Sequence, residues 1–267
     1  MASHLSRVAK SGAMKPIRAL IHGHPGTGKT TFAVGAPSPI FIDTEGGLGL
    51  LNADAFPTPQ SFDEVMDQIL ELTSEEHEYR SLVIDAVDGI EPLLFEKVCN
   101  EGGKAAIADF GFSKGYVTAD ALWVEFFRRL DNLRQIKGMN ILLLSHSQAA
   151  HYDDPTVGTY VRWEPNLHKR TVPLLTKWSD LIAFMDMERI ALDKGEPDKN
   201  RSVRTTRTTG SRFLHAEGDG SFIAKNRFGL SGAIPIPAEN GWSVLAEQLK
   251  AAYGKRGTTT NNEEEAA

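Results

Sequence analysis

Residues 23–30 read Gly-His-Pro-Gly-Thr-Gly-Lys-Thr, which fits the pattern G-x-x-x-x-G-K-[ST]. The apolar run Ile17–His22 before it predicts a buried strand. Residues Lys29–Gly35 after it predict a short helix, which Gly35 and Pro37 stop. This strand–loop–helix context is the one that the pattern requires, because the backbone N–H groups of such a loop form a concave cradle for an anion.

The loop is therefore expected to hold the phosphates of a nucleotide, with ATP and Mg²⁺ as the ligands. Lys29 can reach the β- and γ-phosphate oxygens, and the hydroxyl of Thr30 can ligate the metal. The residues expected to bind the nucleotide are Gly23, His24, Pro25, Gly26, Thr27, Gly28, Lys29, Thr30 and Thr31.

Further strand and helix signals alternate along the chain. Pro39–Asp43, Ser81–Asp85 and Asn140–Ser145 are short apolar runs typical of buried strands. Four helices are expected between and after these strands. One begins at a capping box formed by Ser61 and Glu64, a second spans Glu91–Asn100, a third begins at a cap at Thr118, and the last spans Trp242–Tyr253. Such βα alternation predicts parallel strands with helical crossovers, hence an α/β fold of three layers.

After His146 the pattern changes. Residues Leu181–Ile190, Arg201–Thr208 and Ser221–Lys225 are β-like pieces separated by glycine turns, and they suggest antiparallel strands added to the mostly parallel sheet on its C-terminal side. No linker divides two cores, so we expect one domain over residues 15–253. Residues 1–14 are expected to form a flexible arm and residues 254–267 a disordered acidic tail.

Composition excludes several classes of protein. The single cysteine, Cys99, excludes a disulfide framework and a cysteine-built zinc site. A net charge of −6 argues against a chain that coats nucleic acid by bulk positive charge. No apolar run approaches the roughly 18–20 residues of a membrane span. The N-terminal segment lacks the apolar stretch of a secretory signal, so we expect a cytoplasmic protein without membrane contacts.

Two acidic residues follow predicted buried strands. Asp85 is placed to hold Mg²⁺ through a water, and its alternative role is a helix cap. Many P-loop ATPases carry a glutamate directly after such an aspartate, but here the next residue is Ala86. Glu45 is therefore the best candidate for the general base of ATP hydrolysis, since the carboxyl ends of parallel strands share one edge. Its alternative is a loop acid beside two glycines.

His146 and Ser147 end the fourth predicted strand. They are expected at the same edge of the sheet, where they could sense the γ-phosphate through hydrogen bonds. A structural histidine with satisfied hydrogen bonds is the alternative for His146.

Several of these segments resemble RecA-type recombinases. Residues 41–46 (Phe-Ile-Asp-Thr-Glu-Gly) look like the strand that ends in their catalytic glutamate, Val83–Asp85 resembles their metal-binding strand, and Leu143–His146 stands where they carry a phosphate-sensing amide. Residues 224–228 (Ala-Lys-Asn-Arg-Phe) resemble the stretch that reaches the neighbouring subunit's ATP. The resemblance implies that Lys225 and Arg227 act in trans. The alternative is a pair of exposed bases at a strand end.

The chain most resembles the minimal RecA-like ATPases of bacteriophages that serve as single-strand annealing recombinases, over roughly residues 15–237. It departs from cellular recombinases in lacking room for their large accessory domains, in carrying His146 at the sensor position, and in showing no clear N-terminal polymerisation segment.

RecA-like proteins bind DNA through two mobile loops, and the matching stretches here are Glu101–Val117 and Ser147–Arg170. Both interleave aromatic and basic side chains, which suits stacking on bases and tracking of phosphates. The candidates are Lys104, Phe112, Lys114, Tyr116, Arg162, Trp163, Lys169 and Arg170. The alternative is that the aromatic side chains anchor each loop to its own core.

The resemblance implies a DNA-linked ATPase that binds single-stranded DNA and promotes annealing or strand exchange in phage recombination, within the host bacterial cytoplasm. It also implies self-association into a ring or filament, and a single-strand-binding protein is a candidate partner. A replicative motor or helicase loader is one alternative. A small-molecule P-loop kinase is the other, with Arg201, Arg204, Arg207 and Arg212 as its lid.

Overall fold

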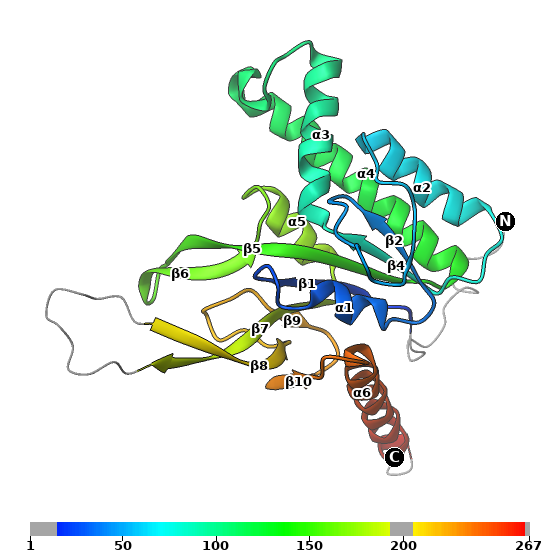
Figure 1. The fold of residues 1–267 in the computed structure, drawn as a ribbon, viewed down its shortest axis with the longest axis vertical. Helices are drawn as coiled ribbons and strands as arrows, with labels where there is room; N and C mark the ends of the chain where they lie inside the picture. Colours follow the sequence, from blue (N-terminus) through cyan, green and yellow to red (C-terminus); the bar gives the residue numbers. More distant parts are fainter. Residues whose placement is uncertain (1–14, 193–204, 265–267) are drawn as a thin grey trace, which may run out of the picture.

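The computed structural model describes residues 15–192 and 205–264, which build one mixed sheet with helices on both faces (Figure 1). The strands lie in the order β10-β8-β7-β1-β5-β4-β2-β3, with β6 paired to β5 and β9 paired to β7. Their bounds are β1 Arg18–Gly23, β2 Pro39–Asp43, β3 Asp54–Ala55, β4 Ser81–Asp85, β5 Asn140–Asp154, β6 Gly158–Pro165, β7 Leu181–Leu192, β8 Thr205–His215, β9 Lys225–Asn226 and β10 Ala233–Ile236.

Two layers of helices cover the sheet. Their bounds are α1 Lys29–Val34, α2 Phe62–Ser74, α3 Val87–Gly102, α4 Lys114–Lys137, α5 Thr171–Trp178 and α6 Gly241–Glu264, with short 3₁₀ turns at Ile107–Asp109 and Gly111–Ser113. The alternation along β2 shows how the layers arise: Ile40 and Ile42 pack with α2, α3 and α4, while Phe41 faces the α1 and α6 side.

The central strands agree with the sequence prediction. β2 and β4 have the predicted bounds, and β1, β2, β4 and β5 run parallel. Ser61 caps α2, since its Oγ accepts a hydrogen bond from Glu64 N at 3.2 Å. The expected three-layer α/β fold, with a mostly parallel sheet and antiparallel strands on the C-terminal side, is confirmed.

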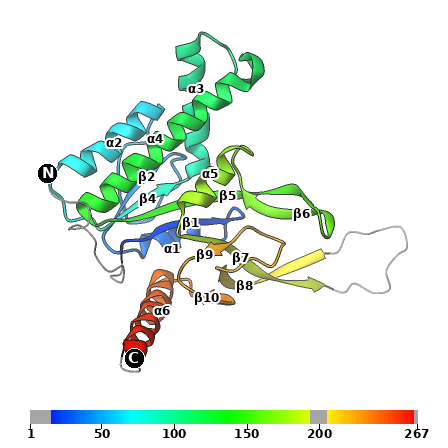
Figure 2. The ribbon, with the colours of Figure 1, turned by 180° about the vertical axis from the view of Figure 1, so that it is seen from behind.

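The expectation of a long loop over residues 147–170 is wrong. β5 continues to Asp154 and pairs with β6 in an antiparallel hairpin that projects past the sheet (Figures 1 and 2). Only the first part of β5 is buried on both faces. The projecting part has few buried side chains, so its sequence lacks the apolar run by which a core strand is found.

The segment expected as a loop over residues 101–117 is shorter than predicted. α3 ends at Gly102 and α4 begins at Lys114, so the segment between the two helices spans residues 103–113. α3 also begins four residues earlier than expected, at Val87 instead of Glu91. Thr118 does not cap α4 but lies in its second turn, where its Oγ1 donates to the Lys114 carbonyl at 3.2 Å. α3 and α4 extend past the sheet as an arm (Figure 1).

The C-terminal strands differ in detail from the prediction. β7, expected to be antiparallel, runs parallel to β1, while β8, β9 and β10 add in antiparallel fashion. Of residues 221–225 only Lys225 belongs to a strand, and Ser221 and Ile223 instead exchange backbone hydrogen bonds with Trp163. Arg201 and Arg204 lie outside the described residues.

The helix α6 continues to Glu264, through residues 254–264 that we expected to belong to a disordered acidic tail. Once the first turns of a helix are docked, each added residue costs little to extend it. The expected arm over residues 1–14 lies outside the described residues. Among the described helices, none is long and apolar enough to cross a membrane.

Candidate nucleotide-binding site

The glycine-rich loop joins β1 to α1 in a conformation that only glycine allows at several positions. Gly26 and Gly28 have φ of 77° and 90°, the left-handed region that disfavours other residues. At Gly23 a side chain would meet the carbonyl oxygen of Met185 at 2.2 Å, because β7 lies directly beside β1. The spacing of glycines in the sequence thus reflects backbone geometry.

Lys29 lies at the start of α1 with its side chain turned back over the loop. Its Nζ donates hydrogen bonds to the carbonyl oxygens of Gly23 and His24, both at 3.1 Å. Burial lowers the pKa of Lys29, while the carboxylates of Asp85, Asp88 and Glu45 act in the opposite direction. The ammonium group is therefore held at the loop, where an anion would meet it.

Thr30 and Asp85 supply the oxygen atoms that a magnesium ion prefers. Thr30 Oγ1 donates to Asp85 Oδ2 at 2.7 Å, which brings the end of β4 against the start of α1. Burial raises the pKa of Asp85, and the hydrogen bond from Thr30 opposes that rise. A hydroxyl and a carboxylate side by side fit Mg²⁺, which is bound by few protein oxygens and keeps several waters.

Asp43, at the end of β2, shapes the turn that carries Glu45. Its carboxylate accepts hydrogen bonds from the backbone N–H groups of Glu45, Gly47 and Leu48 at 3.1–3.2 Å. β2 and β4 are neighbours, so the turn lies at the same edge of the sheet as Asp85. Sequence reasoning placed Glu45 at this edge and did not find the role of Asp43.

Glu45 forms a cluster with His146 and Asp88. His146 Nδ1 lies 2.9 Å from Asp88 Oδ2 and 3.5 Å from Glu45 Oε1, and its backbone N–H donates to Asp88 Oδ1 at 3.0 Å. Burial, then the nearby carboxylates of Asp88 and Asp85, raise the pKa of Glu45, while His146 and Lys29 lower it. Asp88 belongs to no sequence motif, and its role appears only from its two hydrogen bonds to His146 and from the 7% exposure of its side chain.

One cavity of about 380 Å³ lies over the glycine-rich loop and the strand ends. Glu45, Asp85 and His146 face it together with Lys29 and Thr30 of the glycine-rich loop. Arg212, from β8, also lines this cavity. The sequence offered Arg212 only as part of the lid of the kinase alternative, and its place at this cavity depends on the pairing of β8 with β7.

The sequence profile of a family described as "AAA domain" matches residues 15–228. The chain belongs to this AAA domain family. The AAA domain is therefore a nucleotide-binding ATPase, for which ATP and Mg²⁺ are the general ligands. The crystal structure of the RadB recombinase is similar at 16% sequence identity and a TM-score of 0.46, covering 85% of this chain and 90% of that chain. No curated protein matches the chain.

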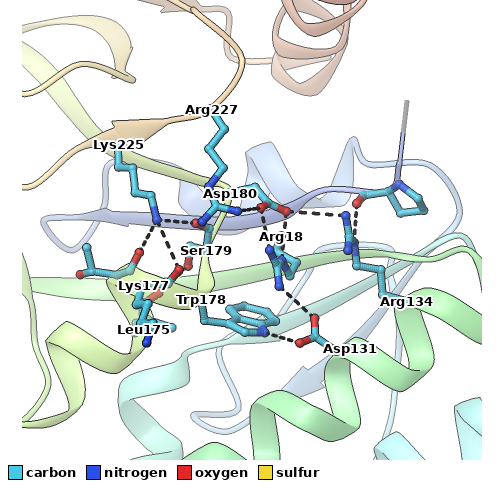
Figure 3. A network of polar contacts seen from close by, with 12 residues as sticks. Arg18, Asp131, Arg134, Leu175, Lys177, Trp178, Ser179, Asp180, Lys225 and Arg227 are labelled. Carbon is cyan, nitrogen blue, oxygen red and sulfur yellow. Dashed lines mark hydrogen bonds and ion pairs between the residues drawn. The ribbon is translucent and has the colours of Figure 1, made fainter. Parts of the chain in front are cut away.

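Lys225 and Arg227 of this AAA domain have partners inside the chain (Figure 3). Lys225 Nζ donates to the carbonyl oxygens of Thr176 and Ser179 at 2.7 and 2.9 Å, where α5 ends. Arg227 Nη1 donates to Asp180 Oδ1 at 3.0 Å. Sequence reasoning foresaw exposed bases or fingers in trans, and did not foresee these bonds.

Both cations lie away from the cavity of their own chain. β9 pairs with Leu181 and Ile182 at the start of β7, whereas Gly23 of the glycine-rich loop pairs with Met185 further along that strand. The two places are roughly 13 Å apart along the strand. Contact with a nucleotide in a neighbouring copy stays a prediction, and the bonded Lys225 is less available for it than the half-exposed Arg227.

The residues expected to bind DNA lie in two parts of the AAA domain. Lys104, Phe112 and Lys114 are exposed at the tip of the α3–α4 arm. Tyr116 instead stacks on His168 with ring centroids 4.5 Å apart. Stacking within the chain is the alternative that the sequence had left open for such aromatic residues.

In the second stretch, Lys169 is exposed, while the other candidates contact the protein itself. The guanidinium of Arg162 lies 3.8 Å from the ring centroid of Tyr152, and Arg170 forms an ion pair with Asp120. The ring of Trp163 meets that of His24 edge to face, with centroids 4.3 Å apart. The β5–β6 hairpin therefore touches the glycine-rich loop.

Proposed function

We propose that the chain is an ATP-dependent, single-stranded-DNA-binding recombinase that promotes annealing or strand exchange, in the recombination of a phage within its bacterial host's cytoplasm. The observation that supports the link between ATP and DNA is the contact of Trp163 with His24. One residue belongs to the hairpin that matches a DNA-binding stretch, and the other belongs to the glycine-rich loop.

Hydrolysis follows from the residues around the cavity. The loop and Lys29 would bind the phosphates, and Thr30 and Asp85 would hold Mg²⁺, which supplies positive charge that neutralises the phosphates when it is bound. Glu45 accepts a proton from a water as the water oxygen bonds to the γ-phosphorus, the bond from the γ-phosphorus to the bridging oxygen breaks, and ADP and phosphate leave. His146, held by Asp88, is positioned beside Glu45 to hydrogen-bond the γ-phosphate.

The DNA surface in this proposal is built from the arm tip and the hairpin. Phe112 is 98% exposed, and Lys104 and Lys114 of the same arm tip are exposed as well, so the tip offers an aromatic ring and two cations. Such a combination binds single strands by stacking and charge, at about 1–3 kcal/mol for each stacked base. Bound ATP would favour the DNA-binding form through the loop and hairpin, and a single-strand-binding protein is a candidate partner.

The test is fluorescence anisotropy of a labelled strand of about 30 nucleotides, with and without a non-hydrolysable ATP analogue, at two salt concentrations. We expect tight, salt-sensitive binding that the analogue strengthens. Absence of binding in every nucleotide state would contradict the proposal.

Two other functions use the same core. A replicative motor or helicase loader would unwind strands or capture a helicase, whereas a recombinase would anneal complementary strands without unwinding. A small-molecule kinase is favoured by one observation, the presence of Arg212 at the cavity. A kinase would transfer the γ-phosphate to an acceptor other than water and would act as a monomer.

A further inference from the structure

Arg212 stands apart from other arginines of the chain. Arg18, Arg170 and Arg227 each form ion pairs with aspartates. Within residues 15–190 and 207–253, whose side chains the structure describes, the Arg212 guanidinium makes no hydrogen bond or ion pair, although the residue is only partly exposed. A partly desolvated cation without an anion is costly, so this side chain is suited to a negatively charged ligand.

The strand register directs Arg212 toward the nucleotide loop. Arg212 pairs with Met187 of β7 and with Ile236 of β10. Leu214, two residues on and on the same face of β8, is fully buried in the cluster that contains Phe32 of α1. Arg212 therefore projects on the α1 side of the sheet.

Its guanidinium lies directly against the loop. A methyl group built on Gly28 would meet Arg212 Nη1 at 2.9 Å, Cζ at 3.0 Å and Nε at 3.2 Å. Gly28 is the residue immediately before Lys29. The side chains of Arg212 and Lys29 therefore lie close together and line the same cavity. Two cations on one anion-binding loop are balanced when a polyanion lies between them.

The carboxylates at this cavity have other partners. Asp43 holds three backbone N–H groups, Asp85 accepts from Thr30, and Glu45 lies beside His146. Hence Arg212 is not needed to neutralise any of them.

We propose that Arg212 binds the phosphates of the nucleotide that its own polypeptide holds, as a second phosphate-binding cation beside Lys29. This inference rests on the proposed nucleotide binding and adds to it a residue that the sequence offered only for the lid of the kinase alternative. The ligand class is a nucleoside di- or triphosphate, and the guanidinium donates charge-assisted hydrogen bonds to its phosphate oxygens. A charged hydrogen bond of this kind changes affinity by about 10- to 100-fold when it is removed.

The experiment measures equilibrium binding of ATP, ADP and AMP to the full chain by calorimetry. Arg212→Gln keeps a side chain that can pack against the loop but removes the charge, and Arg212→Lys restores the charge. Arg128→Ala, at an arginine that is 72% exposed on α4, is the control. We expect Arg212→Gln to weaken ATP or ADP about 10- to 100-fold, Arg212→Lys to recover part of the affinity, and Arg128→Ala to bind as the wild type does.

The outcomes separate this inference from the proposed function. If Arg212→Gln binds both nucleotides as tightly as the wild type, Arg212 is not a phosphate ligand, whatever the wild type does. If Arg212→Lys binds nucleotide as weakly as Arg212→Gln, while both variants have the melting temperature of the wild type, the positive charge of Arg212 does not contribute to nucleotide affinity. The inference is then also wrong. A wild-type chain that binds no nucleotide would overturn the proposed function and this inference together.

Discussion

Glu45 tests the catalytic assignment at the level of one residue. Replacing it with glutamine removes the proton acceptor but keeps the shape of the side chain beside His146. We expect Glu45→Gln to bind ATP normally and to lower ATP turnover by about 10²- to 10⁴-fold, the range of a general base. Phosphate release under saturating ATP measures turnover, and nucleotide titration measures binding.

Lys29→Ala is the contrasting variant, since it should abolish nucleotide binding itself. Wild-type turnover by Glu45→Gln would show that another group activates the water. Loss of nucleotide binding in Glu45→Gln would point instead to a structural role for the turn that Asp43 holds.

Residues of the site differ in how far the sequence could predict them. Lys29, Thr30, Asp85 and Glu45 follow from a loop pattern and from strand ends, which are local signals, and the structure brings all four to one cavity. Arg212 could not be found in this way. It reaches the loop through the pairing of β8 with β7, which no local pattern encodes.

At the scale of elements, one polar network joins β1, α4, α5, β7 and β9 (Figure 3). Asp180 accepts from Arg18 Nε and Nη2 at 3.0 and 2.7 Å, and it also pairs with Arg134 and Arg227. Burial alone would raise the pKa of Asp180, but the hydrogen bond and charge of Arg18, followed by Arg134 and Arg227, hold the pKa below its usual range.

Asp180→Asn should therefore destabilise the fold in a pH-dependent way. A carboxyl group whose folded-state pKa is lowered adds stability above its unfolded pKa of about 3.9 and loses it as pH falls through the folded value. We expect the free energy of unfolding to fall by about 1–3 kcal/mol at pH 7, because Arg18, Arg134 and Arg227 lose the carboxylate that they share, with a smaller difference below about pH 4. Urea denaturation across this pH range measures it.

Asp63→Asn is the control for that experiment. Asp63 also pairs with a cation, Lys97, but its side chain is 66% exposed. Such surface pairs contribute little, so its unfolding free energy should change by less than about 1 kcal/mol. An Asp180→Asn variant as stable as the wild type at pH 7 would mean that the network is not a source of stability.

Strands could be predicted from the sequence where both faces of the sheet are buried. β2 and β4 are short apolar runs between polar residues, so their bounds follow from the sequence. The β5–β6 hairpin projects past the sheet and buries few side chains, so alternation gives no signal there. The direction of β7 depends on its partner β1, which lies more than 150 residues earlier in the chain.

For the whole molecule, the proposed contact of Arg227 with a neighbouring copy's nucleotide predicts head-to-tail assembly. The cavity lies at the carboxyl edge of the parallel strands, and Arg227 lies beside the start of β7, at the other end. A contact that joins one copy's Arg227 to the next copy's cavity uses two different surfaces. Contacts of this type close into rings or continue as filaments, the forms that the RecA resemblance implies.

Sedimentation velocity tests this assembly in one experiment. We expect the wild-type chain to form larger species when a non-hydrolysable ATP analogue and single-stranded DNA are both present. Arg227→Ala should reduce that assembly by 10-fold or more in apparent affinity, about the effect of a lost charged contact. It should bind nucleotide normally as a monomer, because its own cavity is at the opposite edge.

Arg128→Ala is the matched control, since Arg128 is 72% exposed on α4 and pairs only weakly with Glu125 at 3.7 Å. If Arg227→Ala assembles like Arg128→Ala and the wild type, the contact in trans is not made by Arg227. If the wild type itself stays monomeric with both ligands present, a head-to-tail recombinase is excluded and the kinase alternative gains weight. A kinase would then need an acceptor at the same cavity, where Arg212 already faces the nucleotide loop.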